Sequence, residues 1–175
     1  HDRIPPPMNV LLTSVGRRTY LLDYFRTALA GRGRVFAANT TGDSVGMMLA
    51  DVAFIVPAAN NPAYIDAILG ICSEHGVMLV LSLHDWEAPF LAAHSSRFRA
   101  RGIQLVVSSP AVMDLCLDKY KTYEFAVRHE IATPATLKSL PEARQALADG
   151  HLHFPLVIKP RQGQGSIGLE FVEEE

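Results

Sequence analysis

The sequence predicts an α/β fold, in which a parallel sheet with helices on both faces is followed by a smaller unit of α+β type. The first observation behind this prediction is that short apolar runs alternate with helical patterns over residues 8–109, because neighbouring parallel strands need a crossover, usually a helix, between them. The second is that the alternation stops after Ser109, where a longer helical pattern and a glycine-rich hairpin follow. The third is that 49% of the 175 residues are hydrophobic, which is enough to bury a sizeable core.

Five strands of the first domain are predicted from short, nearly continuous apolar runs, which are typical of strands buried on both faces. In chain order the runs are NVLLTS, RVFAANT, DVAFIVP, VMLVLSL and IQLVVSS, which begin at Asn9, Arg34, Asp51, Val77 and Ile103. A strand, a helix and the next parallel strand almost always form a right-handed crossover. Residues 8–109 are therefore expected to form a Rossmann-like domain.

The helices between these strands are predicted from apolar residues three or four positions apart. The first helix has one apolar face made of Leu21, Leu22, Phe25 and Leu29. Asn61 followed by Pro62 is the pattern of an N-cap and a first-turn proline, and Gly76 marks the end of that helix. Another helix is expected to begin near Asp85, with Pro89 in its first turn.

From residue 110 onward the pattern indicates a different, α+β unit. A long helical stretch beginning at Pro110 is expected to break near Asp118, and TPATLKSL is expected to be an edge strand because it contains Pro134. Ser139 and Glu142 have the spacing of a capping box for the next helix. The runs FPLVIKP and IGLEFVE then flank a glycine-rich loop, which favours a hairpin.

The sequence is therefore expected to have three segments. Residues 1–7, HDRIPPP, contain three prolines and are interpreted as a cloning remnant or a disordered end. Residues 8–109 are the Rossmann-like domain, and residues 110–175 are the first part of a second domain.

Charge and composition argue against several classes of partner. Sixteen basic and eighteen acidic side chains give a net charge of -2, so the overall charge favours neither nucleic acid nor an anionic membrane. No apolar run is long enough to span a bilayer, and no signal-peptide pattern is present. Cys72 and Cys116 are interpreted as buried thiols of a reducing cytosol, without the spacing of a metal site. We expect a cytoplasmic protein with small-molecule partners, for which a homodimer is left open.

The loop RQGQGSIG near the end of the sequence predicts an anion site. Gly163, Gly165 and Gly168 let backbone N–H groups turn inward, a geometry that holds phosphate oxygens. Alternation along the preceding strand places Val157 and Lys159 on the same side, so Lys159 would add a positive charge to such a site. The alternative interpretation is a solvent-facing lysine beside a flexible hairpin. The order of residues is not that of a P-loop, where the lysine follows the glycines.

These residues, taken with the stretch LDKYKTYEFAVRHEIATPAT, resemble the ATP-grasp superfamily, most closely its carbamoyl-phosphate synthase large-subunit-like carboxylate-amine ligases. The family pattern is a D-K pair that begins a helix, a G-I-x-T-P-like turn, a strand that ends in lysine, and a glycine-rich flap. The corresponding residues here are Asp118 and Lys119, then Ile131, Thr133 and Pro134, then Lys159, and then Gly163 to Gly168. The family's usual glycine before the isoleucine is Glu130 in this sequence. Residues 8–109 match the family's Rossmann-like preATP-grasp domain by architecture alone.

The resemblance implies a site and a reaction. Lys119 and Lys159 would hold the ATP phosphates, and the loop that closes over them would contribute Gln162, Gly163, Gln164, Gly165, Ser166 and Gly168. The implied reaction is activation of a carboxylate by ATP to an acyl phosphate, followed by attack of an amine or ammonia. Mg²⁺ would be required, and the family's metal ligands lie downstream of the flap, so no metal ligand is expected up to residue 175 and this chain alone is expected to be inactive. The alternative is a non-catalytic Rossmann-like domain that binds a nucleotide or another small molecule.

The first domain carries a second candidate site at the end of its first strand. Gly16, Arg17 and Arg18 lie where parallel sheets bind ligands, and the arginines are candidates to bind a substrate carboxylate, with a solvated helix start as the alternative. A single glycine does not make the G-x-G-x-x-G pattern, which argues against NAD. Asp85 and Glu87 are candidates to orient an amine substrate, with helix capping as the alternative.

Overall fold

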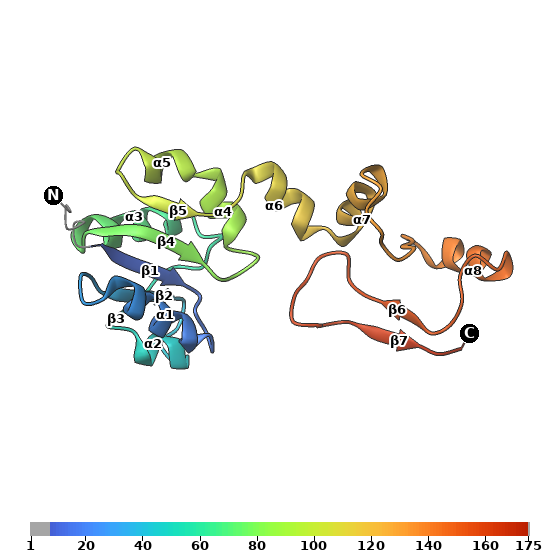
Figure 1. Cartoon of the computed structure of the whole chain (residues 1–175), viewed down its shortest axis with the longest axis horizontal. Helices are drawn as coiled ribbons and strands as arrows, with labels where there is room; N and C mark the ends of the chain where they lie inside the picture. Colours follow the sequence, from blue (N-terminus) through green and yellow to red (C-terminus); the bar gives the residue numbers. More distant parts are fainter. Residues whose placement is uncertain (1–7, 175) are drawn as a thin grey trace. The chain divides into compact units, whose positions relative to one another are not determined.

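The computed structural model describes residues 8–174 and is shown in Figure 1. The chain divides into two compact units, unit 1 (His1–Pro110) and unit 2 (Ala111–Glu175). Unit 1 contains a five-stranded sheet, and unit 2 contains a two-stranded one.

The sheet of unit 1 is parallel throughout. Its strands are β1 Asn9–Thr13, β2 Val35–Asn39, β3 Val52–Ile55, β4 Val77–Ser82 and β5 Gln104–Val106, in the spatial order β3-β2-β1-β4-β5. Every neighbouring pair runs in the same direction. The predicted Rossmann-like α/β fold and its five strands are therefore confirmed.

Helices cover both faces of this sheet (Figure 1). They are α1 Thr19–Leu29, α2 Val45–Leu49, α3 Tyr64–Glu74, α4 Ala88–Ala93 and α5 Ser95–Arg99. Successive residues of β1 enter opposite cores: Leu11 packs in the cluster that includes residues of α3, α4 and α5, whereas Leu12 packs in the cluster that includes residues of α1 and α2. Both leucines are 0% exposed. A strand buried on both faces has no polar side to show, which explains the continuous apolar run in the sequence.

Two helices of unit 1 begin later than the sequence predicts. Helix α3 begins at Tyr64, and the Asn61 side chain instead accepts a hydrogen bond from the Ala63 N–H at 2.9 Å in the turn before the helix. Asparagine bonds the backbone two residues ahead in turns as well as at caps, so its position alone does not fix the first helical residue. Helix α4 begins at Ala88, with Pro89 in its first turn as predicted.

The short helix α2 has no counterpart among the predicted elements, because five residues are too few to show a helical period. A close backbone approach sets its place: the Gly46 N–H donates to the Gly16 carbonyl at 2.8 Å. A Cβ atom at Gly46 would lie 2.3 Å from a methyl carbon of Val15, so a larger residue does not fit without displacing that strand end.

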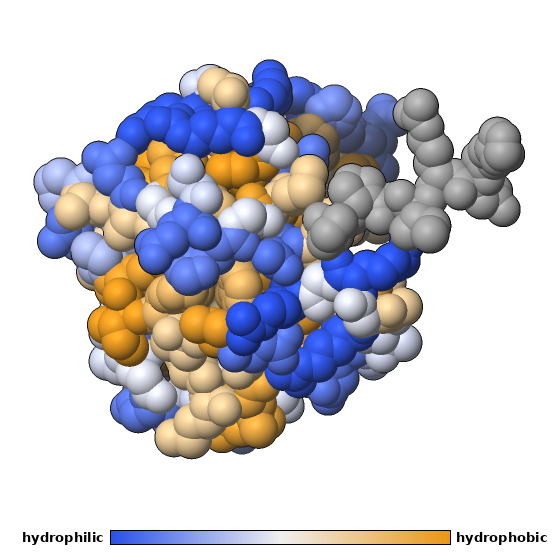
Figure 2. Space-filling model, turned by 90° about the vertical axis from the view of Figure 1, so that its left-hand side faces the viewer, coloured by the Kyte–Doolittle hydropathy of each residue, from blue (hydrophilic) through white to orange (hydrophobic). Residues whose placement is uncertain are grey.

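The outer sides of α1 and α2 keep apolar side chains in contact with solvent. The exposed residues are Tyr20 and Tyr24 on α1 and Val45, Met48 and Leu49 on α2. Figure 2, which looks at the left-hand side of the view in Figure 1, shows apolar patches between charged groups, including one at its lower edge. Exposed apolar groups of this kind are ordinary on the surface of a folded protein.

Unit 2 contains helices α7 Lys119–Arg128 and α8 Leu140–Ala148 and the antiparallel strands β6 Leu156–Ile158 and β7 Glu170–Val172, while α6 Pro110–Leu117 begins at the division between the units. The predicted break at Asp118 and the predicted hairpin are confirmed. The Ser139 part of the predicted capping box is confirmed: the Glu142 N–H donates to Ser139 Oγ at 3.4 Å. The Glu142 carboxylate accepts from the Lys138 N–H at 3.0 Å, one residue before the N-cap, in place of the reciprocal bond to Ser139.

The predicted edge strand in TPATLKSL is wrong. Residues 131–137 form no strand in the described structure, and most of their side chains are exposed. Pro134 has no N–H to donate to a ladder, and none of the described strands pairs with this segment.

The two cysteines differ in burial, which corrects the prediction that both are buried. Cys72 packs in the core of unit 1, and burial raises the pKa of its thiol to about 12. Cys116 is exposed on α6, a helix that buries none of its residues. Both cysteines are free. Among residues 8–174 no helix is both long enough and apolar enough to cross a membrane.

Helix α7 ends in a Schellman motif with a glutamate at the left-handed position. The Glu130 N–H donates to the Val127 carbonyl at 3.2 Å, and the Ile131 N–H donates to the Ala126 carbonyl at 2.8 Å. Glu130 has a φ of 55°, a conformation that glycine adopts without strain. The departure from the family's usual glycine therefore carries a cost in backbone strain.

Replacing Glu130 with glycine is expected to stabilise unit 2. The change relieves about 1–2 kcal/mol of left-handed strain, and the greater freedom of glycine in the unfolded chain takes back about 0.5–1 kcal/mol, which leaves a gain of up to about 1.5 kcal/mol. Urea unfolding followed by circular dichroism measures the gain. Glu124→Gly, inside α7, is the matched control and should lose about 1 kcal/mol. A Glu130→Gly variant no more stable than the parent protein contradicts the prediction.

Candidate functional site

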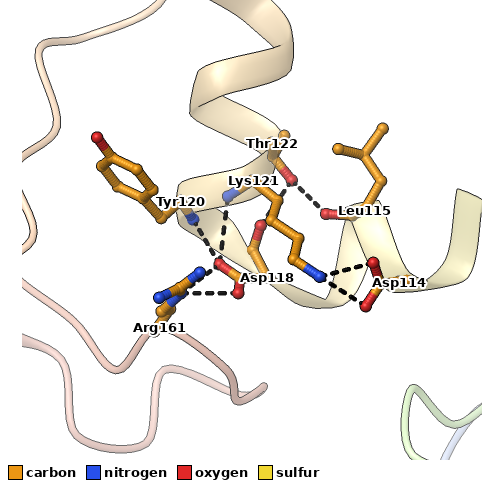
Figure 3. A network of polar contacts seen from close by, with 7 residues as sticks. All are labelled: Asp114, Leu115, Asp118, Tyr120, Lys121, Thr122 and Arg161. Carbon is orange, nitrogen blue, oxygen red and sulfur yellow. Dashed lines mark hydrogen bonds and ion pairs between the residues drawn. The ribbon is translucent and has the colours of Figure 1, made fainter.

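Helix α7 begins at an aspartate whose side chain bonds the first free N–H groups of the helix. Asp118 Oδ1 accepts hydrogen bonds from the backbone N–H groups of Tyr120 at 3.0 Å and Lys121 at 3.2 Å (Figure 3). These bonds satisfy two of the four donors that a helix leaves unpaired at its N-terminus. The D-K pair in the sequence is thus a helix start, with Lys119 as the first helical residue.

Arg161 pairs with the same aspartate from the loop that follows β6 (Figure 3). Its Nε lies 2.8 Å from Oδ1 and 2.7 Å from Oδ2 of Asp118, whose side chain is 6% exposed. The hydrogen bond from Arg161, and then the bonds from the helix N–H groups, lower the pKa of Asp118 to about 2. Sequence reasoning missed Arg161, because an arginine 43 residues from its acidic partner forms no recognisable pattern.

Lys119 ties this loop to the start of α7 by two further contacts. Its backbone N–H donates to the Arg161 carbonyl at 3.0 Å, and its side-chain ammonium donates to the Gly163 carbonyl at 3.1 Å. Gly163 has a φ of 142°, a backbone conformation that residues other than glycine rarely adopt. The structure therefore brings Lys119 and the first glycine of the loop together.

The loop between β6 and β7 spans residues 159–169 and bends through left-handed conformations. The φ angle is 65° at Gly165, 59° at Ser166 and 71° at Gly168. A Cβ atom at Gly168 would lie 2.9 Å from Pro160 Cγ, so the chain passes close to this proline. The glycines adopt these left-handed conformations without strain. Ser166 adopts one as well, and because it has a side chain this conformation is strained.

The remaining predicted residues of this site are open to solvent to different degrees. Lys159 directly follows β6 and is exposed. Gln162 is exposed, and Gln164 is half-buried. Lys159 is thus accessible to a ligand, whereas the Lys119 ammonium already contacts the loop.

An apolar pair lies beside Lys159 on the hairpin. Val157 lies opposite Phe171 in the antiparallel register, and the two residues are 48% and 72% exposed. Alternation along the strand puts Lys159 on the same side of β6 as Val157. The hairpin therefore presents an apolar surface next to a positive charge, which suits a flat ring system attached to an anionic group.

Unit 1 holds a buried carboxylate at the carboxyl ends of β1 and β4. Glu87 is 6% exposed; its Oε2 accepts from Thr13 Oγ1 at 2.5 Å and Ser82 Oγ at 2.7 Å. Its Oε1 accepts from Ser14 Oγ at 3.3 Å. Burial, and then the negative charge of Glu87, raise the pKa of nearby Tyr64. The strand order reverses between β1 and β4, which is where sheets of this kind bind ligands.

The other predicted residues of unit 1 are more open than Glu87. Gly16, with a φ of 56°, is followed by the exposed Arg17 and Arg18. Asp85 is also exposed, and its interpretation as a helix cap is wrong because α4 begins later and has no side-chain cap bond. The Glu87 carboxylate thus already accepts hydrogen bonds from hydroxyl groups. These contacts indicate that Glu87 stabilises the strand ends and argue against direct contact with a ligand.

A family model described as the PylC-like, N-terminal domain matches residues 10–106, which is more than half of the chain. The chain belongs to this family. The match runs from β1 to the end of β5, so it covers nearly all of the sheet of unit 1. No curated protein sequence matches the chain.

Solved structures similar to this PylC-like chain are larger proteins. The ADP complex of purK, an N5-carboxyaminoimidazole ribonucleotide synthetase, is 14% identical, with a TM-score of 0.68 over 98% of this chain and 42% of that one. The L-amino acid ligase from Bacillus licheniformis is 18% identical, with a TM-score of 0.66 over 97% of this chain and 40% of that one. The N5-carboxyaminoimidazole ribonucleotide synthetase from Thermotoga maritima is 16% identical, with a TM-score of 0.62 over 96% and 42%. At these identities the likeness concerns the fold, and the PylC-like chain spans less than half the length of each of these three proteins.

The family match over residues 10–106 and the shared fold of these structures agree with the predicted Rossmann-like domain, and the likeness to ligases and synthetases holds at the level of the fold. The assignment of residues 110–175 to the start of an ATP-grasp domain stays a prediction. The roles of the individual site residues stay predictions as well.

Replacing Glu87 with alanine is expected to destabilise unit 1 by about 2–4 kcal/mol. The change leaves the hydroxyls of Thr13 and Ser82 without their acceptor, and each unsatisfied buried group costs about 1–3 kcal/mol. Urea unfolding measures the loss. Asp85→Ala, two residues earlier and exposed, is the matched control and should change stability by less than about 0.5 kcal/mol. Equal stability of the two variants contradicts the support role of Glu87.

Replacing Asp118 with asparagine is expected to lower stability at neutral pH and to have a decreasing effect in acid. The folded-state pKa of about 2 lies below the unfolded value of about 3.9, so the carboxylate stabilises the fold above about pH 4 and loses this effect as the pH falls through about 2. Asparagine also caps helices well, so the cap itself is kept. Urea unfolding of both proteins between about pH 2 and 7 measures the difference. A stability difference that does not change with pH is the contrary result.

Proposed function

We propose that this chain is the first part of an ATP-dependent carboxylate-amine ligase and that unit 2 binds the nucleotide phosphates. The observation that carries the proposal is the contact of the Lys119 ammonium with the glycine-rich loop, 3.1 Å from the Gly163 carbonyl. A cation at the N-terminus of a helix, beside a loop with left-handed glycines, suits a phosphate group. Membership of the PylC-like family and the likeness in fold to a ligase and to a synthetase solved with ADP support it.

In this proposal the chain's own residues bind and orient the phosphates. Lys119 and Lys159 supply two positive charges, and backbone N–H groups of the loop from Gln162 to Gly168 supply the shape. Phosphoryl transfer depends mainly on positioning and on neutralising charge on the phosphate oxygens, which these groups provide. The Lys119 ammonium exchanges a neutral carbonyl for a phosphate oxygen, and the new bond is the stronger one because both donor and acceptor are charged.

The exposed pair on the hairpin is proposed as the surface against which the nucleotide base lies. Val157 and Phe171 would cover one face of the ring, and binding would remove their exposed apolar surface from water. The substrate carboxylate then attacks the γ-phosphorus of ATP, so that an acyl phosphate forms and ADP leaves. An amine or ammonia attacks the acyl carbon, and phosphate leaves as the amide bond forms.

Mg²⁺ is the ion that accompanies ATP in such a reaction, where it neutralises phosphate charge. Within residues 8–174, no group of three or more His, Cys, Asp or Glu side chains lies together in a way that could hold a metal ion. We place the carboxylate ligands of Mg²⁺ beyond residue 175 and assign no step to the metal.

The experiment that tests the function is an ADP-release assay on the full-length protein. The protein is incubated with MgATP, an amine mixture and a panel of small carboxylates, and ADP is measured against ligated product. ADP that appears only with a carboxylate, in equal amount to product, supports the ligase. Binding of ATP without turnover for any carboxylate indicates the non-catalytic alternative.

Lys159→Ala and Lys119→Ala are each expected to weaken MgATP binding by about 10- to 150-fold in the full-length protein. A charge-assisted bond to phosphate is worth about 1.5–3 kcal/mol, and neither change removes a buried side chain. The double variant should lose less than the product of the two single losses, because the lysines share one ligand. Isothermal titration calorimetry measures each affinity.

Lys121→Ala is the matched control for these lysines. It lies on the same turn of α7, but its ammonium pairs with Asp114 at 2.6–2.8 Å instead of contacting the loop. It should bind MgATP within about twofold of the parent protein, since surface ion pairs contribute little. An equal loss of MgATP affinity in all three variants would show a general effect of positive charge and would contradict the assigned roles of Lys119 and Lys159.

A further inference from the structure

Arg161 is held in place through only one of its three nitrogens. Its Nε contacts both carboxylate oxygens of Asp118, and no hydrogen bond or ion pair engages Nη1 or Nη2 among residues 8–174. The side chain is 54% exposed, although its partner is 6% exposed. A guanidinium carries five N–H donors, so the four on the terminal nitrogens are available to a ligand.

Asp118 acts as a support for this guanidinium and is not itself free to bind a ligand. Its Oδ1 accepts from two helix N–H groups as well as from Arg161, and its Oδ2 accepts from Arg161 (Figure 3). The ring of Tyr120, with its centroid 5.8 Å from Arg161 Cζ, lies beside the guanidinium and further restricts it. An arginine fixed at Nε, with its outer edge open, is prepared for a two-point contact.

Arg161, whose terminal nitrogens are unbonded within the described part of the chain, lies in the part of the loop that Lys119 contacts. The carbonyl of Arg161 accepts from the Lys119 N–H, and the Lys119 ammonium lies at Gly163, two residues further along. Lys119 thus contacts the backbone of the loop at Arg161 and at Gly163, so both cations belong to the start of the glycine-rich loop. A lysine offers a point charge and an arginine offers a planar fork, and a polyphosphate can use both at once.

We propose that Arg161, oriented by Asp118, is a further phosphate-binding residue that donates from its two terminal nitrogens to two oxygens of one nucleotide phosphate. This inference rests on the proposed function, because it places Arg161 in the same nucleotide site. In this arrangement Asp118 is a positioning residue, and the two lysines need not neutralise the phosphates alone. The competing role for Arg161 is structural, as a tie between the loop and α7.

The test measures the loss of binding affinity when Arg161 is replaced, and asks whether this loss grows with the number of phosphates in the ligand. Arg161→Ala, Arg161→Lys and Asp118→Asn are made in the full-length protein, and ATP, ADP and adenosine are titrated by calorimetry. Arg161→Ala should weaken ATP binding by about 10- to 100-fold, as expected for a charged two-point contact, and should leave adenosine binding within about twofold of the parent protein. Arg161→Lys should recover only part of the loss, because it keeps the charge but not the fork.

Asp118→Asn separates orientation from direct contact. Asparagine keeps the helix cap, but without a negative charge it binds the guanidinium less strongly. ATP binding should therefore weaken by about three- to tenfold. Arg128→Ala, at the far end of α7, removes one positive charge away from the loop and is the matched control. Thermal unfolding of each variant shows whether the fold is kept.

The outcomes separate this inference from the function on which it rests. Parent protein that is folded but binds no MgATP overturns the proposed function, and the role of Arg161 with it. If the parent protein binds MgATP and Arg161→Ala binds it equally well, the role of Arg161 is overturned and the proposed function stands. Equal weakening of ATP and adenosine identifies Arg161 as a structural tie and also overturns the proposal.

Discussion

Strand β1 sets the constraint on which the rest of unit 1 depends, because it is paired on both edges and buried on both faces. Both hydrophobic clusters of the unit include its residues, so helices must cover both sides of the sheet. At the carboxyl end of the strand the hydroxyl of Thr13 is fully buried and needs an acceptor, which Glu87 provides from the start of α4. The same carboxylate reaches β4 through Ser82. The polar cluster at the edge of the sheet is therefore a consequence of the burial of the central strand.

Unit 2 is organised by a different kind of contact. Of its described residues, Ala126, at 8% exposed, is the one buried apolar residue. Order comes instead from bonds that satisfy helix ends: Asp118 at the start of α7, the Schellman motif at its end, and Ser139 at the start of α8. Each such bond is worth little alone, since capping contributes about 0.5–2 kcal/mol. The pair of Asp118 with Arg161 matters because it joins one of these helix ends to the loop that follows β6.

The sequence predicts those features that short-range patterns determine. Continuous apolar runs identify the five strands of the sheet, and the Ser139–Glu142 spacing identifies a helix start. Features that depend on distant partners are missed. The helix α2 depends on the fit of Gly46 against Val15, the exposure of Cys116 depends on what α6 packs against, and the importance of Arg161 depends on a carboxylate far away in the sequence. The same limit applies to the site: its glycines and lysines are visible as a motif, whereas the contact that orients Arg161 exists only in the folded chain.

The hairpin of β6 and β7 has a consequence for how this protein is made. The two hydrophobic clusters of unit 1 are complete once residue 107 has been synthesised, so its core can form while later residues are still being added. The hairpin emerges afterwards as a sheet of only two strands, with Phe171 72% exposed and Val157 and Ile158 about half exposed. A two-stranded hairpin is marginally stable by itself, and open strand edges pair readily with other chains. Until other residues cover it, this short segment therefore exposes strand edges and apolar side chains, which are the features that favour aggregation of a growing chain.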